Sequence, residues 1–199
     1  MPLDPLATAA DVEALLGREL TTAEETRYTF LLAASSARVR TYTGQEFTSR
    51  STSDRLQVRR GRVRLPQRPV TAVSAVEDVN NNAILYTWDA GEWLILGNEL
   101  NLFDREPWSS GIRWVDVTYT HGYASIPADV VQVVLQMSAR AFAVPADKTG
   151  YGAENIDGYS YSLGGAAAAG AVGMLNDEVA ALDVYRRMGS SIPTPQVWL

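Results

Sequence analysis

The sequence predicts an α+β fold with two N-terminal helices, a central antiparallel β meander or small sandwich, and C-terminal helices that carry a long Gly/Ala-rich loop and an extended tail. Apolar residues recur at helical spacing in segments 1–44 and 127–189, whereas polar and apolar residues alternate from 46 to 123. A chain of 199 residues can bury a substantial core, so we expect a single domain over 1–189 followed by a tail over 190–199.

Residues 8–17 form the first predicted helix. Thr8 can cap its N-terminus, and Gly17 ends it because glycine adopts the left-handed conformation of a helix C-cap without strain. The apolar residues Val12, Leu15 and Leu16 fall on one face, which is the expected packing face.

A longer helix is predicted from Thr22 to Gly44. Thr22 and Glu25 have the spacing of a capping box, in which each side chain accepts a hydrogen bond from the other residue's backbone N–H. Its expected buried stripe, at helical spacing, is Tyr28, Leu31, Leu32, Ser35, Val39 and Tyr42.

The middle of the chain predicts a series of short strands. Residues 60–61 supply a turn signal, and the prolines within 65–69 interrupt pairing because proline cannot donate a backbone hydrogen bond. Residues 89–92 predict a hairpin that joins strand 84–88 to strand 93–96, and the clearest strand is 112–120. In the strand after the prolines, strict alternation predicts one face made of Val70, Ala72, Ser74 and Val76.

Helical periodicity returns after Pro127. The expected buried stripe is Val130, Val133, Val134, Met137 and Ala141. Residues 147–173 are rich in glycine and predict one long loop, a length that is usually functional or mobile in a compact domain. The last helix is predicted to begin at Asn176 as its cap and to carry Arg186 and Arg187 in its final turn, where cations suit the helix dipole.

Composition narrows the class of protein. Hydrophobic residues make up 46% and charged residues 20%, which is ordinary for a globular chain. The absence of cysteine excludes a disulfide scaffold, a thiolate metal site and a cysteine nucleophile. The N-terminus lacks a signal-peptide pattern and no segment is apolar enough to span a bilayer, so we expect a soluble protein made in the cytoplasm, with no membrane partner.

Charge is distributed unevenly along the chain. The net charge is −6, but residues 50–68 contain seven arginines and one aspartate, so that segment is +6 and the remainder is −12. Such a segment is a charged, solvated strand face, an interface with an acidic neighbour, or a local contact with DNA phosphates. We favour the interface, with DNA contact second. The candidate residues are Arg59, Arg60, Arg62, Arg64 and Arg68.

The sequence offers no assembled catalytic or metal site. His121 is the only histidine, and without a second histidine or a cysteine it lacks the partners of a triad or a metal centre. The glycine-rich segment does not match a phosphate-binding motif. We therefore expect no enzymatic activity, no metal and no cofactor.

Two alternatives use the tryptophans and acids of the β region. A carbohydrate-binding or tail-associated β module would stack sugars on tryptophan rings, and a glycosidase-like enzyme would need two carboxylates beside a cleft. The candidate carboxylate pairs are Asp89 with Glu92 and Asp104 with Glu106. The candidate rings are Trp88, Trp93 and Trp108. Asp89 and Glu92 occupy turn positions and core packing is the commoner role of strand tryptophans, so both alternatives rank below a structural role.

The order of the elements and six short stretches resemble the head-to-tail connector (adaptor) proteins of long-tailed bacteriophages. The stretches follow one another in that order over most of the chain. They are LATAADVEALLG at 6–17, YTGQEF at 42–47, LPQRPVTAV at 65–73, VTYTHGY at 117–123, IPADV at 126–130 and LDVYRR at 182–187.

The resemblance implies a structural virion protein that forms a ring, in the family usually a dodecamer, beneath the portal of the DNA-filled head. The implied partners are other copies of the chain, the portal protein, and a head-completion (stopper) or tail terminator protein. Genomic double-stranded DNA would pass through the lumen without sequence-specific contact during ejection. The implied location is the virion neck, at the head–tail junction, after assembly in the host cytoplasm.

Two segments are candidates for contacts in such a neck. The tail over 190–199 contains two prolines that keep it extended, and tryptophan is a favoured interface anchor, so we expect the tail to grip the portal. Its candidate contact residues are Ile192, Val197, Trp198 and Leu199. The second candidate is the loop over 147–173, which we expect to face the lumen or a neighbouring ring.

Overall fold

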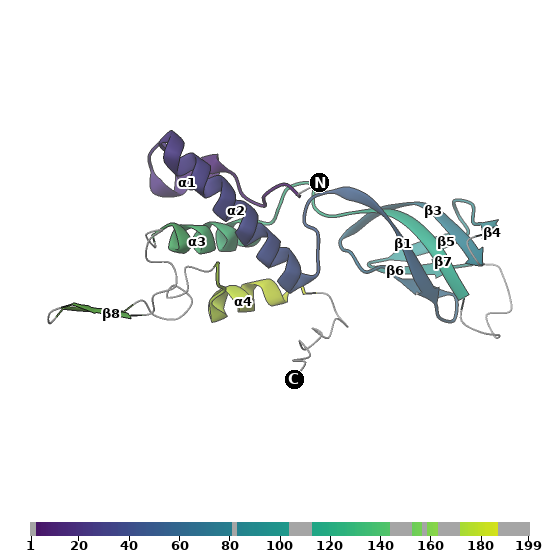
Figure 1. The fold of residues 1–199 in the computed structure, drawn as a ribbon. Coiled ribbons are helices and arrows are strands. Elements are labelled where there is room, and N and C mark those ends of the chain that lie inside the picture. The colour runs from purple at the N-terminus through teal and green to yellow at the C-terminus, as the bar shows by residue number, and fades with distance from the viewer. Residues whose placement is uncertain are drawn as a thin grey trace. The chain divides into compact units, whose positions relative to one another are not determined.

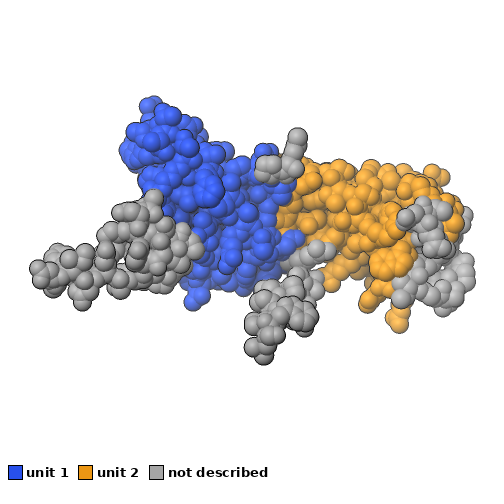
Figure 2. All heavy atoms as spheres, viewed as in Figure 1, with its two compact units in different colours: residues 1–44, 126–186 blue, residues 45–125, 187–199 orange. Residues whose placement is uncertain are grey.

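The computed structural model describes residues 3–80, 83–103, 113–143, 153–156, 159–162 and 172–186, and it confirms the α+β class. The chain divides into two compact units (Figure 2). Unit 1 combines residues 1–44 with 126–186, and unit 2 combines residues 45–125 with 187–199. The two helical ends of the sequence therefore belong to one unit and the β-rich middle to the other. The single domain expected over 1–189 stays a prediction.

Unit 1 is built mainly from helices. They are α1 (Ala9–Leu16), α2 (Thr22–Thr43), α3 (Ala128–Ala143) and α4 (Asn176–Asp183) (Figure 1). The hairpin of β8 (Ala153–Ile156) and β9 (Tyr159–Ser162) lies within the segment that was predicted as one loop over 147–173. That prediction missed the hairpin because its strands are only four residues long.

The predicted stripes of α2 and α3 are buried except at Tyr42, which is half-buried, and they bring these two helices side by side (Figure 1). Leu32 and Met137 are almost fully buried. The hydroxyls of Ser35 and Ser138 lie 2.9 Å apart, which satisfies two polar groups inside the contact. The ring of Tyr28 stacks on Phe142 with 4.2 Å between centroids. Helical periodicity therefore predicted this pair of helices correctly.

The cap of α1 agrees with the prediction, but its apolar face does not. Thr8 is the N-cap and Gly17 the left-handed C-cap. Val12 is buried, whereas Leu15 and Leu16 are 56% and 41% exposed. A helix of eight residues has room for few packing positions, and here Val12 is the one residue of α1 that is fully buried.

The N-cap of α2 lies one residue earlier than predicted. Its capping box joins Thr21 to Glu24, with Glu24 accepting the Thr21 N–H at 2.9 Å, so the predicted box of Thr22 and Glu25 was wrong. The two pairs have the same spacing, and Arg18 decides between them because its guanidinium lies 2.6 Å from Glu24. The hydrogen bond from Arg18, followed by the bond from Thr21, lowers the pKa of Glu24 to about 2.

The helix α4 also differs from the prediction. Its N-cap is Leu175 and Asn176 is already helical, so Asn176 is not the cap. Glu178 takes over the capping role by accepting the Leu175 N–H at 2.8 Å. Arg186 lies beyond the end of α4, and position 187 is outside the described residues.

An ion pair attaches α4 to α3. Arg140 donates to both carboxylate oxygens of Glu178, at 2.6 and 2.8 Å, and to the carbonyl of Gly173 at 3.0 Å. The Glu178 side chain is only 4% exposed. A carboxylate so buried is stable only when it is paired, which explains why an acid occupies a packing position of α4.

Unit 2 is a small sandwich of two antiparallel sheets, one of the two architectures predicted for this region. The first sheet has the order β1 (Arg50–Val58), β7 (Arg113–His121), β3 (Val70–Asn80) and β4 (Ala83–Thr87). The second has the order β2 (Arg62–Arg64), β6 (Glu99–Leu102) and β5 (Trp93–Leu96). One apolar core lies between them, made of Val58, Val63, Leu65, Val76, Trp88, Leu100, Leu102, Val115, Val117 and Tyr119.

The strand β3 does not keep strict alternation. Its register against β7 shifts between Val70 and Ala72 and again between Val73 and Ala75. Each shift adds a residue to one strand, so Val70, Val73 and Val76 all pack on the core. Ala72 and the serine at position 74 are exposed, and their predicted grouping with Val70 and Val76 was wrong.

The strands β4 and β5 do not form the predicted hairpin. β4 pairs with β3 in the first sheet, and β5 pairs with β6 in the second, so residues 88–92 carry the chain from one sheet to the other. Trp88 fills the core at this crossing, and its backbone N–H donates to the Val76 carbonyl at 2.9 Å. Burial of this large ring favours the crossing over a local turn.

Replacement of Gly122 by alanine should destabilise unit 2 strongly. Gly122 has φ +98°, and an added Cβ would lie 2.4 Å from the Thr48 carbonyl oxygen, which is backbone and cannot rotate away. We expect Gly122→Ala to lower the free energy of unfolding by about 3 kcal/mol. Gly91→Ala is the matched control, because Gly91 has φ +111° but open space around it; about 1 kcal/mol is expected there. Equal losses in urea unfolding would contradict the steric explanation.

Candidate functional site

The arginine-rich segment includes a tight turn that joins β1 of the first sheet to β2 of the second; we call residues 59–64 the β1–β2 hairpin because Arg59 and Arg62 form an antiparallel bridge. Arg59 donates its backbone N–H to the Arg62 carbonyl at 2.8 Å, and Arg62 returns the bond at 3.0 Å. Arg60 and Gly61 have φ 53° and 75°, which is the geometry of a type I′ turn. Because Val58 and Val63 on either side are buried in the core, the turn directs the arginines between them outward.

The arginines on this hairpin differ in how far they are paired. Arg59 donates twice to the side-chain oxygen of Gln57, at 3.1 and 3.2 Å, and Arg62 lies 3.4 Å from Glu99 on β6. Arg60 and Arg64 are exposed and have no carboxylate within ion-pair distance in the part of the chain that the structure describes. These two guanidinium groups are therefore open to a carboxylate or phosphate of a partner.

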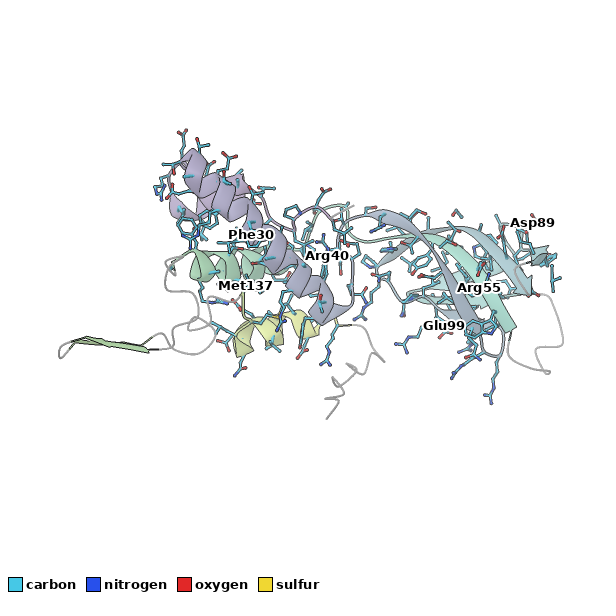
Figure 3. All side chains as sticks on the ribbon, in the orientation of Figure 1. Phe30, Arg40, Arg55, Asp89, Glu99 and Met137 are labelled. Carbon is cyan, nitrogen blue, oxygen red and sulfur yellow. The ribbon has the colours of Figure 1, made fainter. Side chains whose placement is uncertain are left out.

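Two other arginines of the segment have internal roles. Arg55 donates to both oxygens of Asp116 on β7, at 2.8 and 2.9 Å (Figure 3 labels Arg55). This bond lowers the pKa of Asp116 and raises the pKa of Arg55. Arg68 lies outside the hairpin, is half-buried, and donates its backbone N–H to Gln45 at 2.9 Å. Of the five candidate arginines, four therefore lie together on the hairpin.

Unit 2 as a whole carries no net charge. Its residues 45–125 and 187–199 contain 10 acidic and 10 basic residues, whereas unit 1 contains 13 acidic and 7 basic residues and is −6. The hairpin is thus a local cationic feature and not the centre of a broad positive field. Such a feature suits short-range pairing with a few anionic groups better than long-range capture of nucleic acid.

His121 has the structural role that the sequence favours. It is 1% exposed, its Nε2 lies 3.0 Å from the Thr52 hydroxyl, and its ring packs 5.4 Å from that of Tyr119. Burial first, and the charge of Arg50 second, lower the pKa of His121. Within the described ranges, no three His, Cys, Asp or Glu side chains gather in a way that would hold a metal ion.

The candidates for sugar chemistry are engaged elsewhere. Glu92 accepts bonds from the Tyr86 hydroxyl at 2.9 Å and from the Asp89 backbone N–H at 2.6 Å, so its carboxylate organises the loop at 88–92. Trp88 is 3% exposed and cannot stack on a sugar, and Trp93 packs partly against the core. Asp89, the partner of Glu92 in the candidate pair, is exposed, and the other candidates, Asp104, Glu106 and Trp108, lie outside the described residues.

The candidate contact residues of the tail also lie outside the described residues. They are Ile192, Val197, Trp198 and Leu199. The same holds for most of the segment over 147–173. Across the described helices, none has both the length and the apolar character needed to span a membrane.

No family model and no curated protein matches the sequence. Among solved structures, the chain is similar to one from the "neck of empty GTA particle computed with C6 symmetry", with 20% identity, a TM-score of 0.60, and coverage of 94% of this chain and 93% of that chain. A chain from the "neck of native GTA particle computed with C12 symmetry" has 17% identity, a TM-score of 0.51 and the same coverage.

A third similar chain comes from the "virion of native gene transfer agent (GTA) particle", with 21% identity, a TM-score of 0.55, and coverage of 90% of this chain and 88% of that chain. At these identities the similarity establishes a shared fold. The resemblance predicted from the sequence is therefore confirmed at the level of the fold.

The burial of His121 should make stability depend on pH near neutrality. The unfolded chain takes up this proton near pH ~6.5, and the folded protein takes it up only at lower pH, so the unfolded state binds more protons below that value and stability falls as pH falls. We expect the free energy of unfolding to drop from about pH 7.5 to about pH 5.5, with a slope of at most about 1.4 kcal/mol per pH unit.

The control variant is His121→Gln, which removes the only histidine. Its unfolding free energy, measured in urea over the same pH range, should vary much less. An equal slope in both proteins would show that another group controls the pH dependence.

Proposed function

We propose that this chain is a structural protein of the neck of a phage-like particle, in which several copies form a ring at the head–tail junction. The observation that carries the proposal is the shared fold over 94% of the chain with a chain of a gene transfer agent neck. The six stretches that resemble phage connector proteins support it independently, because they come from the sequence and not from the coordinates. The necks in which the similar chains were found were computed with C6 and C12 symmetry, which fits a ring.

Within that neck, we assign the chain the position of the adaptor between the portal and the next tail or head-completion protein. The ring is then expected to be a dodecamer with genomic DNA in its lumen. Unit 1 is −6 and unit 2 is neutral, so the net charge of a ring of these subunits does not attract DNA. DNA phosphates bind where cations gather, and a lumen without them lets the genome pass without being held.

A structural role suits the described residues better than a catalytic one. The His121 imidazole is buried against Thr52, and the Glu92 carboxylate is bound by Tyr86 and by the backbone of Asp89. Catalytic groups need access to a substrate, and these groups face the protein interior or their own loop. Burial of Trp88 likewise removes one of the three candidate rings of a carbohydrate-binding module.

Cryo-electron microscopy of particles from cells that express this chain tests the proposed function directly. We expect density for the chain in a closed ring at the neck, next to the portal. The same map tests the tail, because residues 190–199 should contact the portal protein. Density for the chain at the distal tail, in the capsid shell or nowhere in the particle would contradict the neck assignment.

Neutralising the two unpaired arginines of the hairpin should weaken ring formation. We expect Arg60→Gln with Arg64→Gln to lower the yield of assembled necks several-fold, since exposed ion pairs contribute about 0.2–1 kcal/mol each and every subunit contact would lose two. The control is Arg18→Gln with Arg55→Gln, which removes the same charge from arginines whose acidic partners lie within the chain.

Neck yield and DNA transfer should be measured separately for both double variants. A normal neck yield with reduced DNA transfer would assign the hairpin to DNA contact. Equal losses in the two variants would show that general charge, and not the hairpin, controls assembly.

A further inference from the structure

The solvent face of α2 carries no charged side chain along its centre. The positions that point away from the buried stripe recur at i, i+4, i+7, i+11 and i+15, and all are exposed. They are Thr26, Phe30, Ala33, Ala37 and Thr41. The outward face of a surface helix is normally rich in charged residues, so the centre of this face of α2 lacks the charges that are usual for a helix in contact with water.

Phe30 stands in the middle of this face. It is 73% exposed, and it lies on α2 as labelled in Figure 3. One exposed apolar residue is ordinary on any protein surface. Of the positions three and four residues away along the helix, Thr26, Ala33 and Ala34 are small and Arg27 packs over the Phe142 ring, so no long side chain covers Phe30.

We infer that this face of α2 packs against a helix of a neighbouring copy of the same chain. The inference deepens the proposed function and rests on it, since it names a subunit contact of the proposed ring. Ala33 and Ala37 are short enough for a second helix to approach to about 8–10 Å between axes. Phe30 then acts as the anchor that enters the partner's surface.

Charge on both sides of the contact favours a second copy over nucleic acid. The centre of the face offers no cation to a phosphate, whereas Arg38 is exposed at its border and has no carboxylate partner among the described residues. Unit 1 of a neighbouring copy has a surplus of six acidic residues, 13 against 7 basic ones. An acidic neighbour therefore complements Arg38, and the uncharged centre avoids repulsion between two units of like charge.

The size of the α2 face limits the area that it can bury in a subunit contact. A helix of 22 residues is about 33 Å long, and with a width of about 10 Å its outward face covers roughly 300 Å². A stable contact buries about 800 Å² on each partner, so the face of α2 supplies less than half of the area that a stable contact needs. The ring would need further contacts, which fits a head-to-tail arrangement in which two different surfaces of each subunit meet.

Site-specific photo-crosslinking in cells that assemble the particles tests the inference with the full chain. Phe30→p-benzoylphenylalanine keeps an aromatic ring at the exposed position and introduces the crosslinker. We expect a covalent dimer of the chain on irradiation, with the second peptide identified by mass spectrometry as part of unit 1. A second substitution, Ala37→Glu, should reduce the dimer at least several-fold by placing a charge in the contact. Gln136→Glu adds the same charge to an exposed position of α3 and should leave the dimer unchanged.

The outcomes separate the inference from the proposed function when the crosslinked chain is also assayed for co-purification with particles. Co-purification without a self-crosslink, or with a crosslink only to another protein, overturns the α2 contact and leaves the neck role intact. A self-crosslink without co-purification keeps the contact and overturns the neck role. A dimer that Ala37→Glu does not reduce also overturns the contact, provided that circular dichroism shows the variant to be folded.

Discussion

The structure of unit 2 depends on one apolar core that two sheets must share. The chain enters this core from the first sheet at Val58, leaves it through a two-residue turn, and re-enters from the second sheet at Val63. Because both flanking valines are buried, Arg59 and Arg60 have no direction open to them except outward. The position of the cationic hairpin is therefore a consequence of core packing on both sides of the turn. The shared core also determines where the chain crosses between the sheets at Trp88. The Asp89–Glu92 loop follows this buried ring and is held by the bond from the Asp89 N–H to Glu92.

Elements with strong local signals were predictable from the sequence. The strand of Val115, Val117 and Tyr119 alternates without interruption, and the stripes of α2 and α3 keep helical spacing over several turns. The failures occurred where the local signal is ambiguous and a distant residue decides. Thr21 with Glu24 has the same spacing as Thr22 with Glu25, and Arg18 selects the first pair. The bulges of β3 and the separation of β4 from β5 depend on which strand lies alongside, and alternation alone does not contain that information.

The sequence shows where charged residues cluster, but it does not show which of them are paired in the fold. Seven arginines between 50 and 68 are evident from the sequence, yet only the pairing of β1 with β7 shows that Arg55 is bound to Asp116 and that Arg60 and Arg64 are not similarly occupied. The α2 face was missed for a related reason. Its threonines and alanines have no strong hydrophobic signal, and they become informative only once the opposite stripe is known to be buried.

The uneven charge of the chain affects which surfaces of two copies can come into contact without strong repulsion. Each copy brings a unit of −6 and a unit of zero net charge, so a ring of many copies accumulates negative charge. At physiological ionic strength charges interact over about 8 Å, which means that only groups at the subunit contacts repel strongly. An uncharged helix face and a hairpin with two available arginines are two surfaces on which that repulsion is small. In the proposed ring, the acidic remainder would face solvent or DNA, where repulsion of phosphates would keep the genome free to move. For the proposed neck role, self-assembly and unhindered DNA passage would place the same demand on this sequence, namely that cations without an acidic partner in their own chain be few and lie at the contacts between copies.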